Sequence, residues 1–272
     1  MIQKKQIPLL LLFVNFLFAE FSTLAQLPDS IPVHVSFKLD SKHVQEIRTI
    51  NVWTPTGYDQ NSDSLPVLYM PDGGIEEDFP HIANTLAQLI RSKNIPPVIL
   101  VGIENTQRRL DLTGPTEIES DKTIAPIVGG SENFRNFIQE ELFAEIEKRY
   151  RTTAEKGIIG ESLAGLFIVE TFLLKPEMFD FYLAMDPSLW WNDHYLVRTA
   201  KTHLTKFPGT PKSLWFTSSK TKDISRYTNE FAEILTAENF PNLKWSYTYE
   251  PKEKHHTIYR ATKVKALEWV FN

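Results

Sequence analysis

The chain has 272 residues, of which 42% are hydrophobic and 23% charged, and its formal net charge is −5. This is the composition of an ordinary globular protein, and the length suits one large α/β domain. The chain contains no cysteine, which excludes disulfides, thiolate nucleophiles and cysteine–zinc sites, and it has no basic stripe that would favour nucleic acid as a partner.

The first 25 residues form a segment of their own. Lys4 and Lys5 precede an apolar run over residues 7–18, and the small residue Ala25 follows. This pattern predicts a secretory signal peptide that is cleaved near Ala25. A membrane anchor is the weaker alternative, because a bilayer-spanning helix needs ~20 apolar residues. We therefore expect an exported protein, periplasmic or extracellular, without a membrane span after cleavage and with residues 26–272 as its single domain.

Strands and helices alternate along the rest of the chain. Segments 32–39 and 48–54 alternate between apolar and polar residues, which predicts a hairpin of half-buried strands. Further strands are predicted at residues 66–70, 98–103, 157–159, 181–185, 213–217 and 243–249. Helices are predicted over residues 78–92, 131–150, 163–174, 224–237 and 258–271, and residues 105–126 are predicted to be a long polar loop. Eight strands alternating with helices favour the α/β class, with a mostly parallel sheet that carries helices on both faces.

The most informative motif is Gly160-Glu161-Ser162-Leu163-Ala164. A short apolar run precedes it and an amphipathic helical pattern follows, with small residues two positions before and after Ser162. A strained strand-to-helix turn needs small residues at these places, because larger side chains would collide. The motif therefore predicts a nucleophile elbow, in which Ser162 is the attacking residue. The alternative is a glycine–serine turn without chemistry.

Three other groups follow predicted strands in the order that the α/β-hydrolase fold uses. Gly74 lies after the third strand, Asp223 after the seventh and His255 after the eighth, while Ser162 follows the fifth. We expect His255 to take the proton of Ser162 and Asp223 to orient His255. The backbone N–H groups of Leu163 and Gly74 are expected to form the oxyanion hole. Asp223 could also be an ordinary helix N-cap, which would leave a Ser–His dyad.

The chain from about residue 45 resembles the esterase-D/enterochelin-esterase branch of the α/β-hydrolases. The matching stretches are residues 67–73, 101–105, 108–113, 134–142, 160–165, 186–191 and 253–255. Members of this branch cleave acyl esters, including siderophore trilactones, feruloyl and acetyl esters of polysaccharides and formylglutathione-type thioesters, and some transfer acyl groups to sugars. The family places its histidine two residues after a glutamate, as in Glu253 and His255, which favours His255 over the adjacent His256.

The resemblance also implies that Arg108 contacts the substrate. In the family two arginines are separated by one residue, whereas here Arg108 and Arg109 are adjacent and Leu110 occupies the second position. The family usually has glycine where this chain has Ala164. Trp190 and Trp191 follow the sixth strand and are predicted to line a substrate pocket, with packing in the core as the alternative.

The sequence thus predicts an exported serine hydrolase that cleaves a carboxylic ester through an acyl-enzyme intermediate, with a small-molecule or glycan-linked ester as substrate. No cofactor is expected, and no metal, because the histidines lack ligand-like spacing. Two alternatives stay open. One is an acyltransferase to a sugar, and the other is a non-catalytic binding protein on the same fold. Neither the natural ester nor the oligomeric state follows from the residues.

Overall fold

The computed structural model describes residues 29–124, 126–238 and 240–272. The predicted signal peptide, residues 1–25, lies outside the described residues. Across the described ranges no helix has the length and apolar character needed to cross a membrane.

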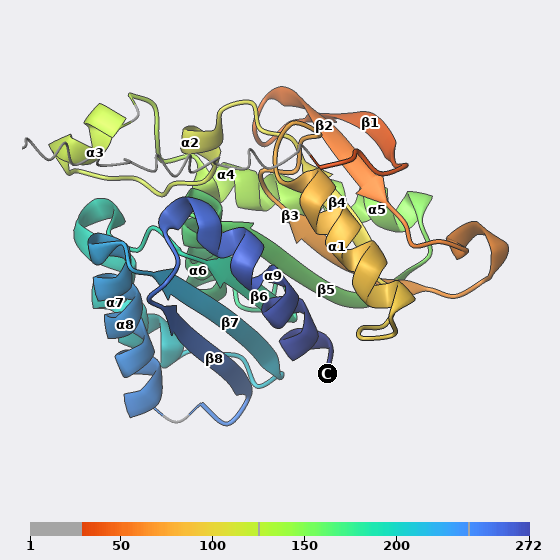
Figure 1. The fold of residues 1–272 in the computed structure, drawn as a ribbon. Coiled ribbons are helices and arrows are strands. Elements are labelled where there is room, and N and C mark those ends of the chain that lie inside the picture. Colours follow the sequence, from red (N-terminus) through yellow and green to blue (C-terminus); the bar gives the residue numbers. More distant parts are fainter. Residues whose placement is uncertain (1–28, 125, 239) are drawn as a thin grey trace, which may run out of the picture.

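One eight-stranded sheet runs through the described part of the chain in the order β1-β2-β4-β3-β5-β6-β7-β8 (Figure 1). The strands span Val35–Ser41, Glu46–Trp53, Leu65–Met70, Ile99–Ile103, Thr152–Glu161, Phe181–Met185, Lys212–Ser219 and Leu243–Glu250, numbered β1 to β8. β1 and β2 form the predicted hairpin, β2 pairs with β4 in the antiparallel sense, and the remaining pairs are parallel. The predicted α/β class, strand number and mostly parallel sheet are confirmed.

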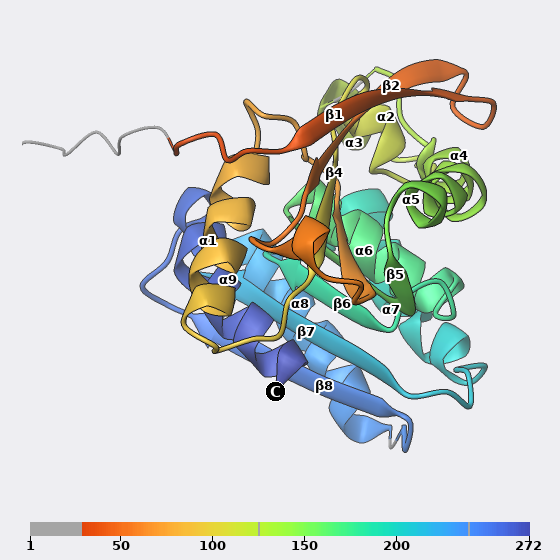
Figure 2. The same ribbon diagram turned by 90° about the vertical axis from the view of Figure 1, so that its right-hand side faces the viewer.

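Helices cover both faces of this sheet (Figure 2). They span Phe79–Arg91 (α1), Arg108–Asp111 (α2), Glu119–Ile124 (α3), Ser131–Asn136 (α4), Phe143–Arg149 (α5), Leu163–Leu174 (α6), Trp191–Leu204 (α7), Lys222–Ala237 (α8) and His255–Phe271 (α9). α1 and α9 lie on one face, and α4 to α8 lie on the other. A 3-10 turn at Tyr58–Gln60 follows β2, and a π-helical turn at Phe137–Leu142 joins α4 to α5.

The structure differs from the sequence-based expectation in local detail. The predicted polar loop 105–126 contains two short helices, α2 and α3, and the helix predicted at 131–150 is interrupted by the π-helical turn. β5 begins at Thr152, five residues before the predicted strand, and α9 begins at His255 rather than near residue 258. Short or interrupted helices carry little periodicity, so a pattern search misses them.

Two hydrophobic clusters lie on the two faces of the sheet. Tyr69 and Val101 belong to the cluster under α4 to α8, while their neighbours Leu68 and Leu100 belong to the cluster under α1 and α9. Successive side chains of a strand point to opposite faces, so a strand covered on both sides needs apolar residues at every position. The parallel strands therefore read as continuous apolar runs, and their carboxyl ends meet at one edge of the sheet, where polar residues follow.

Candidate active site

Ser162 lies in the tight turn between β5 and α6. Its backbone has φ 62° and ψ −118°, a combination that a non-glycine residue adopts only under strain. Gly160 makes this turn possible, because a Cβ atom there would lie 2.6 Å from the methyl group of Ala164. The extra methyl at position 164 is thus accommodated by the absence of a side chain at position 160. The elbow conformation predicted for this motif is present.

His255 lies directly opposite the serine. It is the first residue of α9, and its Nε2 atom lies 3.0 Å from the Ser162 hydroxyl oxygen. His256, the next residue, is exposed to solvent. The structure therefore places His255, as expected, and not His256, against the serine.

The carboxylate that contacts His255 is Asp186, at the end of β6. Its Oδ2 atom lies 2.8 Å from His255 Nδ1. A carboxylate only accepts hydrogen bonds, so Nδ1 carries the proton and Nε2 is free to accept one from Ser162. The prediction that Asp223 fills this position is wrong. Asp223 is an exposed residue of the first turn of α8, whose N-cap is Thr221.

The sequence contains an indication that Asp186 belongs to the site, although counting strands points to Asp223 instead. Asp186 directly follows the buried run Phe181–Met185, and it opens one of the stretches that resemble the esterase branch. β6 and β7 are neighbouring parallel strands, so residues after either strand lie at the same edge of the sheet. Asp186 itself is fully buried and has φ 46°, a conformation that aspartate tolerates better than most residues.

The two predicted oxyanion donors differ in their availability. Leu163 is the first residue of α6, and the first N–H groups of a helix have no partner within it. The N–H of Gly74, in contrast, donates to Glu77 Oε2 at 2.7 Å. A tight turn, closed by a hydrogen bond from Glu77 N–H to Gly74 O, brings that carboxylate back onto the glycine. The expectation that the Gly74 N–H is free to bind an oxyanion is therefore not met in this structure.

A cavity of about 600 Å³ opens beside Ser162 and His255. Its lining combines the Ser162–His255 pair with apolar walls and charged side chains: Arg108, Arg109, Ile124, Ser162, Leu163, Ser188, Trp190, Thr221, Asp223, Ile224, Tyr227 and His255. The predicted pocket positions of Trp190 and Arg108 agree with this lining. Asp223 is also part of the wall, although it does not contact His255.

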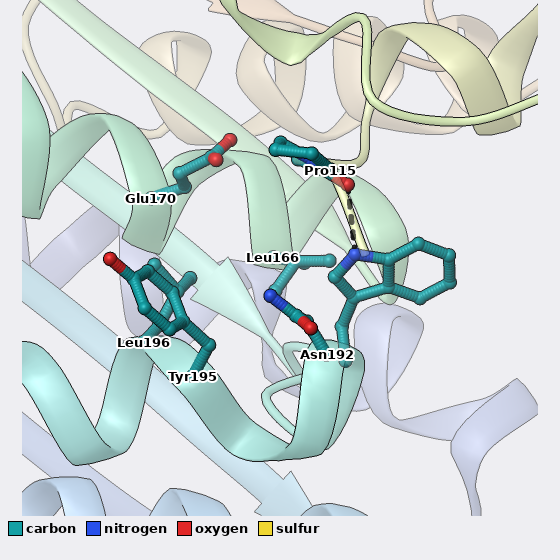
Figure 3. A pocket seen from close by; sticks show the side chains of 8 residues that line it. Pro115, Leu166, Glu170, Asn192, Tyr195 and Leu196 are labelled. Carbon is teal, nitrogen blue, oxygen red and sulfur yellow. Dashed lines mark hydrogen bonds between the residues drawn. The ribbon is translucent and has the colours of Figure 1, made fainter. Parts of the chain in front are cut away.

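Trp191 does not line this cavity. Its side chain is 5% exposed, and its indole N–H donates to the carbonyl oxygen of Gly114 at 3.0 Å. It borders a separate, smaller cavity of about 150 Å³, where Leu166, Glu170 and Tyr195 form part of the wall (Figure 3). Successive residues at a helix start point in directions ~100° apart, so the two tryptophans face different cavities. The prediction for Trp191 as a wall of the substrate pocket is wrong.

Arg108 is fixed at the rim by a two-point ion pair. Its Nε and Nη2 atoms donate to the two carboxylate oxygens of Asp72 at 2.6 and 2.7 Å, and Asn105 also donates to Asp72. This fork geometry leaves Nη1 outside the ion pair, and the ion pair raises the pKa of the guanidinium against the opposing effect of burial. A permanent positive charge thus faces the cavity that contains Ser162.

Two titratable groups next to the serine have shifted pKa values. The hydrogen bond from Asp186 raises the pKa of His255 above its usual value, and negative charge on Glu161 contributes in the same direction. Burial raises the pKa of Glu161 to about 8, and one of its carboxylate oxygens is buried without a hydrogen-bond partner. A base must be neutral to accept a proton, so any activity that depends on His255 falls as the pH falls through this raised pKa.

Glu161→Gln tests the raised pKa of Glu161. A carboxyl group with a pKa of about 8 is mostly neutral at lower pH, as an amide is, so we expect the acid limb of kcat/KM to move to lower pH by no more than a few tenths of a unit. The pH dependence of ester hydrolysis measures this shift. Glu132→Gln, an exposed substitution on α4, is the control and should leave the profile unchanged. A shift of about one unit or more in the Glu161 variant would show that Glu161 is ionised beside His255 and contradicts its raised pKa.

Comparison with known proteins places the chain in a family. Residues 41–264 match the family described as "Putative esterase". The chain belongs to this esterase family.

Its relatives include siderophore esterases. The chain is 30% identical over 164 residues to the ferri-bacillibactin esterase BesA of Bacillus subtilis, a match that covers 53% of this chain and 52% of BesA. It is 27% identical over 191 residues to the siderophore enterobactin esterase of Emericella nidulans, covering 63% of this chain and 61% of that protein. The chain thus spans about half to three fifths of the length of these two relatives.

Among solved structures, the IroE-like serine hydrolase from Shewanella oneidensis is similar to this esterase-family chain along most of its length. The TM-score is 0.82 at 28% identity, over 88% of this chain and 80% of that one. This likeness agrees with the α/β architecture described above. Among the described residues of the chain, no cluster of three or more histidine, aspartate or glutamate side chains is placed to hold a metal ion.

Proposed function

We propose that this chain is a serine hydrolase that cleaves a carboxylic ester, with Ser162 as nucleophile, His255 as base and Asp186 as the residue that orients His255. One observation carries the proposal: the continuous hydrogen-bond chain from Ser162 through His255 to Asp186, placed at a cavity large enough for a small-molecule substrate. Membership of the esterase family supports the same reaction class.

The reaction follows from these contacts. As the Ser162 oxygen attacks the ester carbon, His255 Nε2 takes the hydroxyl proton, and the positive imidazolium is stabilised by Asp186. His255 then gives the proton to the departing alkoxide oxygen, which leaves as an alcohol while the acyl group stays on Ser162. Water repeats the same steps on the acyl-enzyme and releases the carboxylic acid.

The negative oxygen of the tetrahedral intermediate needs donors that are already in place. The Leu163 N–H at the start of α6 is one, supported by the helix dipole. The Arg108 guanidinium, which lines the same cavity with Nη1 free of the Asp72 ion pair, supplies positive charge to the bound substrate. Loss of this charge in Arg108→Gln should lower kcat/KM in an ester assay.

For the substrate we propose an ester bond of a siderophore. The two relatives named above are siderophore esterases by name. The cavity lining includes the aromatic and aliphatic side chains of Trp190, Tyr227 and Ile224, together with the positive charge of Arg108. Such side chains suit an aryl group, and the arginine suits its anionic or polar substituents.

A panel of substrates tests both the proposed reaction, ester hydrolysis, and the proposed substrate class, a siderophore ester. Purified residues 26–272 are assayed on p-nitrophenyl acetate, a catecholate trilactone, a feruloyl ester and an acetylated sugar, with and without added carbohydrate as acyl acceptor. A burst of p-nitrophenol followed by turnover supports an acyl-enzyme, and preferred cleavage of the trilactone supports the substrate class. Cleavage of none of these esters contradicts the hydrolase, and transfer to the carbohydrate favours an acyltransferase.

Export is part of the proposed function, because the segment that carries the signal-peptide pattern precedes the described domain. Mass spectrometry of the protein from its native host is expected to find an N-terminus at or near Gln26. A chain that retains residues 1–25 in the cytoplasm contradicts export and leaves the hydrolase proposal untouched.

A further inference from the structure

The carboxylate of Asp186 is removed from water, with 0% of the residue exposed. A buried carboxylate stays ionised only when hydrogen-bond donors replace its water shell. His255 Nδ1 supplies one donor to Oδ2. The other donors come from one residue of the neighbouring strand: Ser219, the last residue of β7, donates its backbone N–H to Oδ1 and its hydroxyl to Oδ2, the latter at 2.8 Å.

The Ser219 hydroxyl has one proton, and the neighbouring groups leave Asp186 as the acceptor of that proton. Thr221 donates its backbone N–H to the Ser219 hydroxyl oxygen at 3.1 Å, and the two hydroxyl oxygens lie 2.9 Å apart. Since Asp186 can only accept, the consistent arrangement has Thr221 donating to Ser219 and Ser219 donating to Asp186. Each donor polarises the next, which strengthens the bond to the carboxylate.

Ser219 and His255 therefore share one acceptor atom, Asp186 Oδ2. Two donors to one oxygen atom compete for its negative charge, so the hydrogen bond from the Ser219 hydroxyl weakens the one from His255 Nδ1. The serine thus has two effects on the hydrogen bond that orients His255: it fixes the position of the acceptor and limits its basicity.

We propose that Ser219 is a positioning residue for the proposed ester hydrolysis, which holds Asp186 ionised and aimed at His255 through its hydroxyl group. This inference rests on the proposed function for its catalytic consequence, whereas its effect on His255 exists without any substrate. Ser219 ends β7, the strand after which the sequence pattern predicts the acid. In this chain the end of β7 supplies the donors and β6 supplies the acid.

Ser218 provides a matched control. It is equally buried, with 0% exposure, and as the preceding residue of β7 it points to the opposite face of the sheet. Its hydroxyl oxygen lies 2.6 Å from the Tyr247 hydroxyl oxygen. Ser218→Ala and Ser219→Ala therefore each remove one buried hydroxyl from the same strand, and only the second removes a donor to Asp186.

The experiment measures the pKa of His255 in both variants by NMR titration of its ring protons. Removal of one donor makes Asp186 Oδ2 a stronger acceptor, so we expect Ser219→Ala to raise the pKa of His255 by about half to one unit. Ser218→Ala should match the wild type. The other charged groups that act on His255, Glu161 from β5 and Arg108 from α2, are present in every variant, so a difference between the two reports Ser219.

Enzyme kinetics give the second readout. In Ser219→Ala the acid limb of kcat/KM should move to higher pH by the same amount and kcat should fall roughly tenfold with little change in KM, because the acceptor loses its fixed position. If Ser219→Ala does not fold, Ser219→Cys, whose thiol is a weak donor of similar size, carries the test and should raise the pKa of His255 by a smaller amount. A His255 pKa in Ser219→Ala that equals the values of the wild type and of Ser218→Ala overturns the inference. An altered pKa in a protein that cleaves no ester upholds the contact and refutes only the proposed function.

Discussion

Asp186→Asn is expected to lower kcat by roughly 10⁴-fold, while Asp223→Asn keeps kcat within a few-fold of the wild type. An amide at position 186 can present its NH₂ group to His255, which favours the tautomer with the proton on Nε2. That tautomer cannot accept the proton of Ser162, and the imidazolium loses its stabilising charge. Asp223 lines the cavity but does not contact His255, so its neutralisation leaves the base intact.

Steady-state kinetics of both variants on one ester provide the measurement, with thermal unfolding as the check on folding. Both substitutions preserve the size and shape of the side chain, which makes them a matched pair. A Asp186→Asn variant that keeps full activity would show that the site works as a Ser–His dyad. An inactive Asp223→Asn variant together with an active Asp186→Asn variant would show that Asp223, after β7, is the acid that acts with His255.

Ser162→Ala is expected to abolish turnover, lowering kcat by on the order of 10⁶-fold, with no loss of thermal stability. The alanine removes the atom that attacks the ester, and it leaves the strained turn between β5 and α6 with the same backbone requirement. A fluorophosphonate probe should label the wild type at Ser162 and fail to label the variant. Label on another serine, or retained turnover in Ser162→Ala, contradicts the serine-hydrolase mechanism.

The adjacent histidines give this prediction its control. His255→Ala should be as inactive as Ser162→Ala, because residues that act as one unit lose the same reaction when either is removed. His256→Ala should keep most of the activity, because His256 is exposed. If the two histidine variants exchanged these results, the contact between His255 and Ser162 would have no part in catalysis.

Sequence patterns predicted the sheet because the burial of a strand is visible in the sequence as a run of apolar residues. Strands covered on both faces require apolar side chains at each position, so β3, β4 and β6 appear as uninterrupted apolar runs. Ser162 was predictable for a local reason as well. The strained elbow demands small neighbours within a few residues, and Gly160 and Ala164 meet that demand in the sequence itself.

His255 was predicted with help from the family resemblance, since His255 and His256 are equivalent by chain position. The structure distinguishes them because α9 begins at His255, which directs this side chain toward Ser162 and leaves the next one in solvent. The start of a helix depends on capping contacts. Here Lys254 is the N-cap, and its N–H donates to the hydroxyl of Thr257 in the first turn at 3.0 Å.

By itself, the sequence determined the fold class, the tight turn that holds Ser162 and the edge of the sheet at which the candidate site lies, because each depends on residues that are close together in the chain. Tertiary structure alone decided that Asp186 rather than Asp223 contacts His255, that Trp191 faces a second cavity and that the Gly74 N–H is taken by Glu77. The carboxyl ends of β6 and β7 are neighbours at one edge, so either strand could have presented the acid. Asp186 contacts His255 because of its backbone conformation and because Ser219 donates hydrogen bonds to its carboxylate. Both features depend on the alignment of β6 with β7, two strands that are far apart in the sequence.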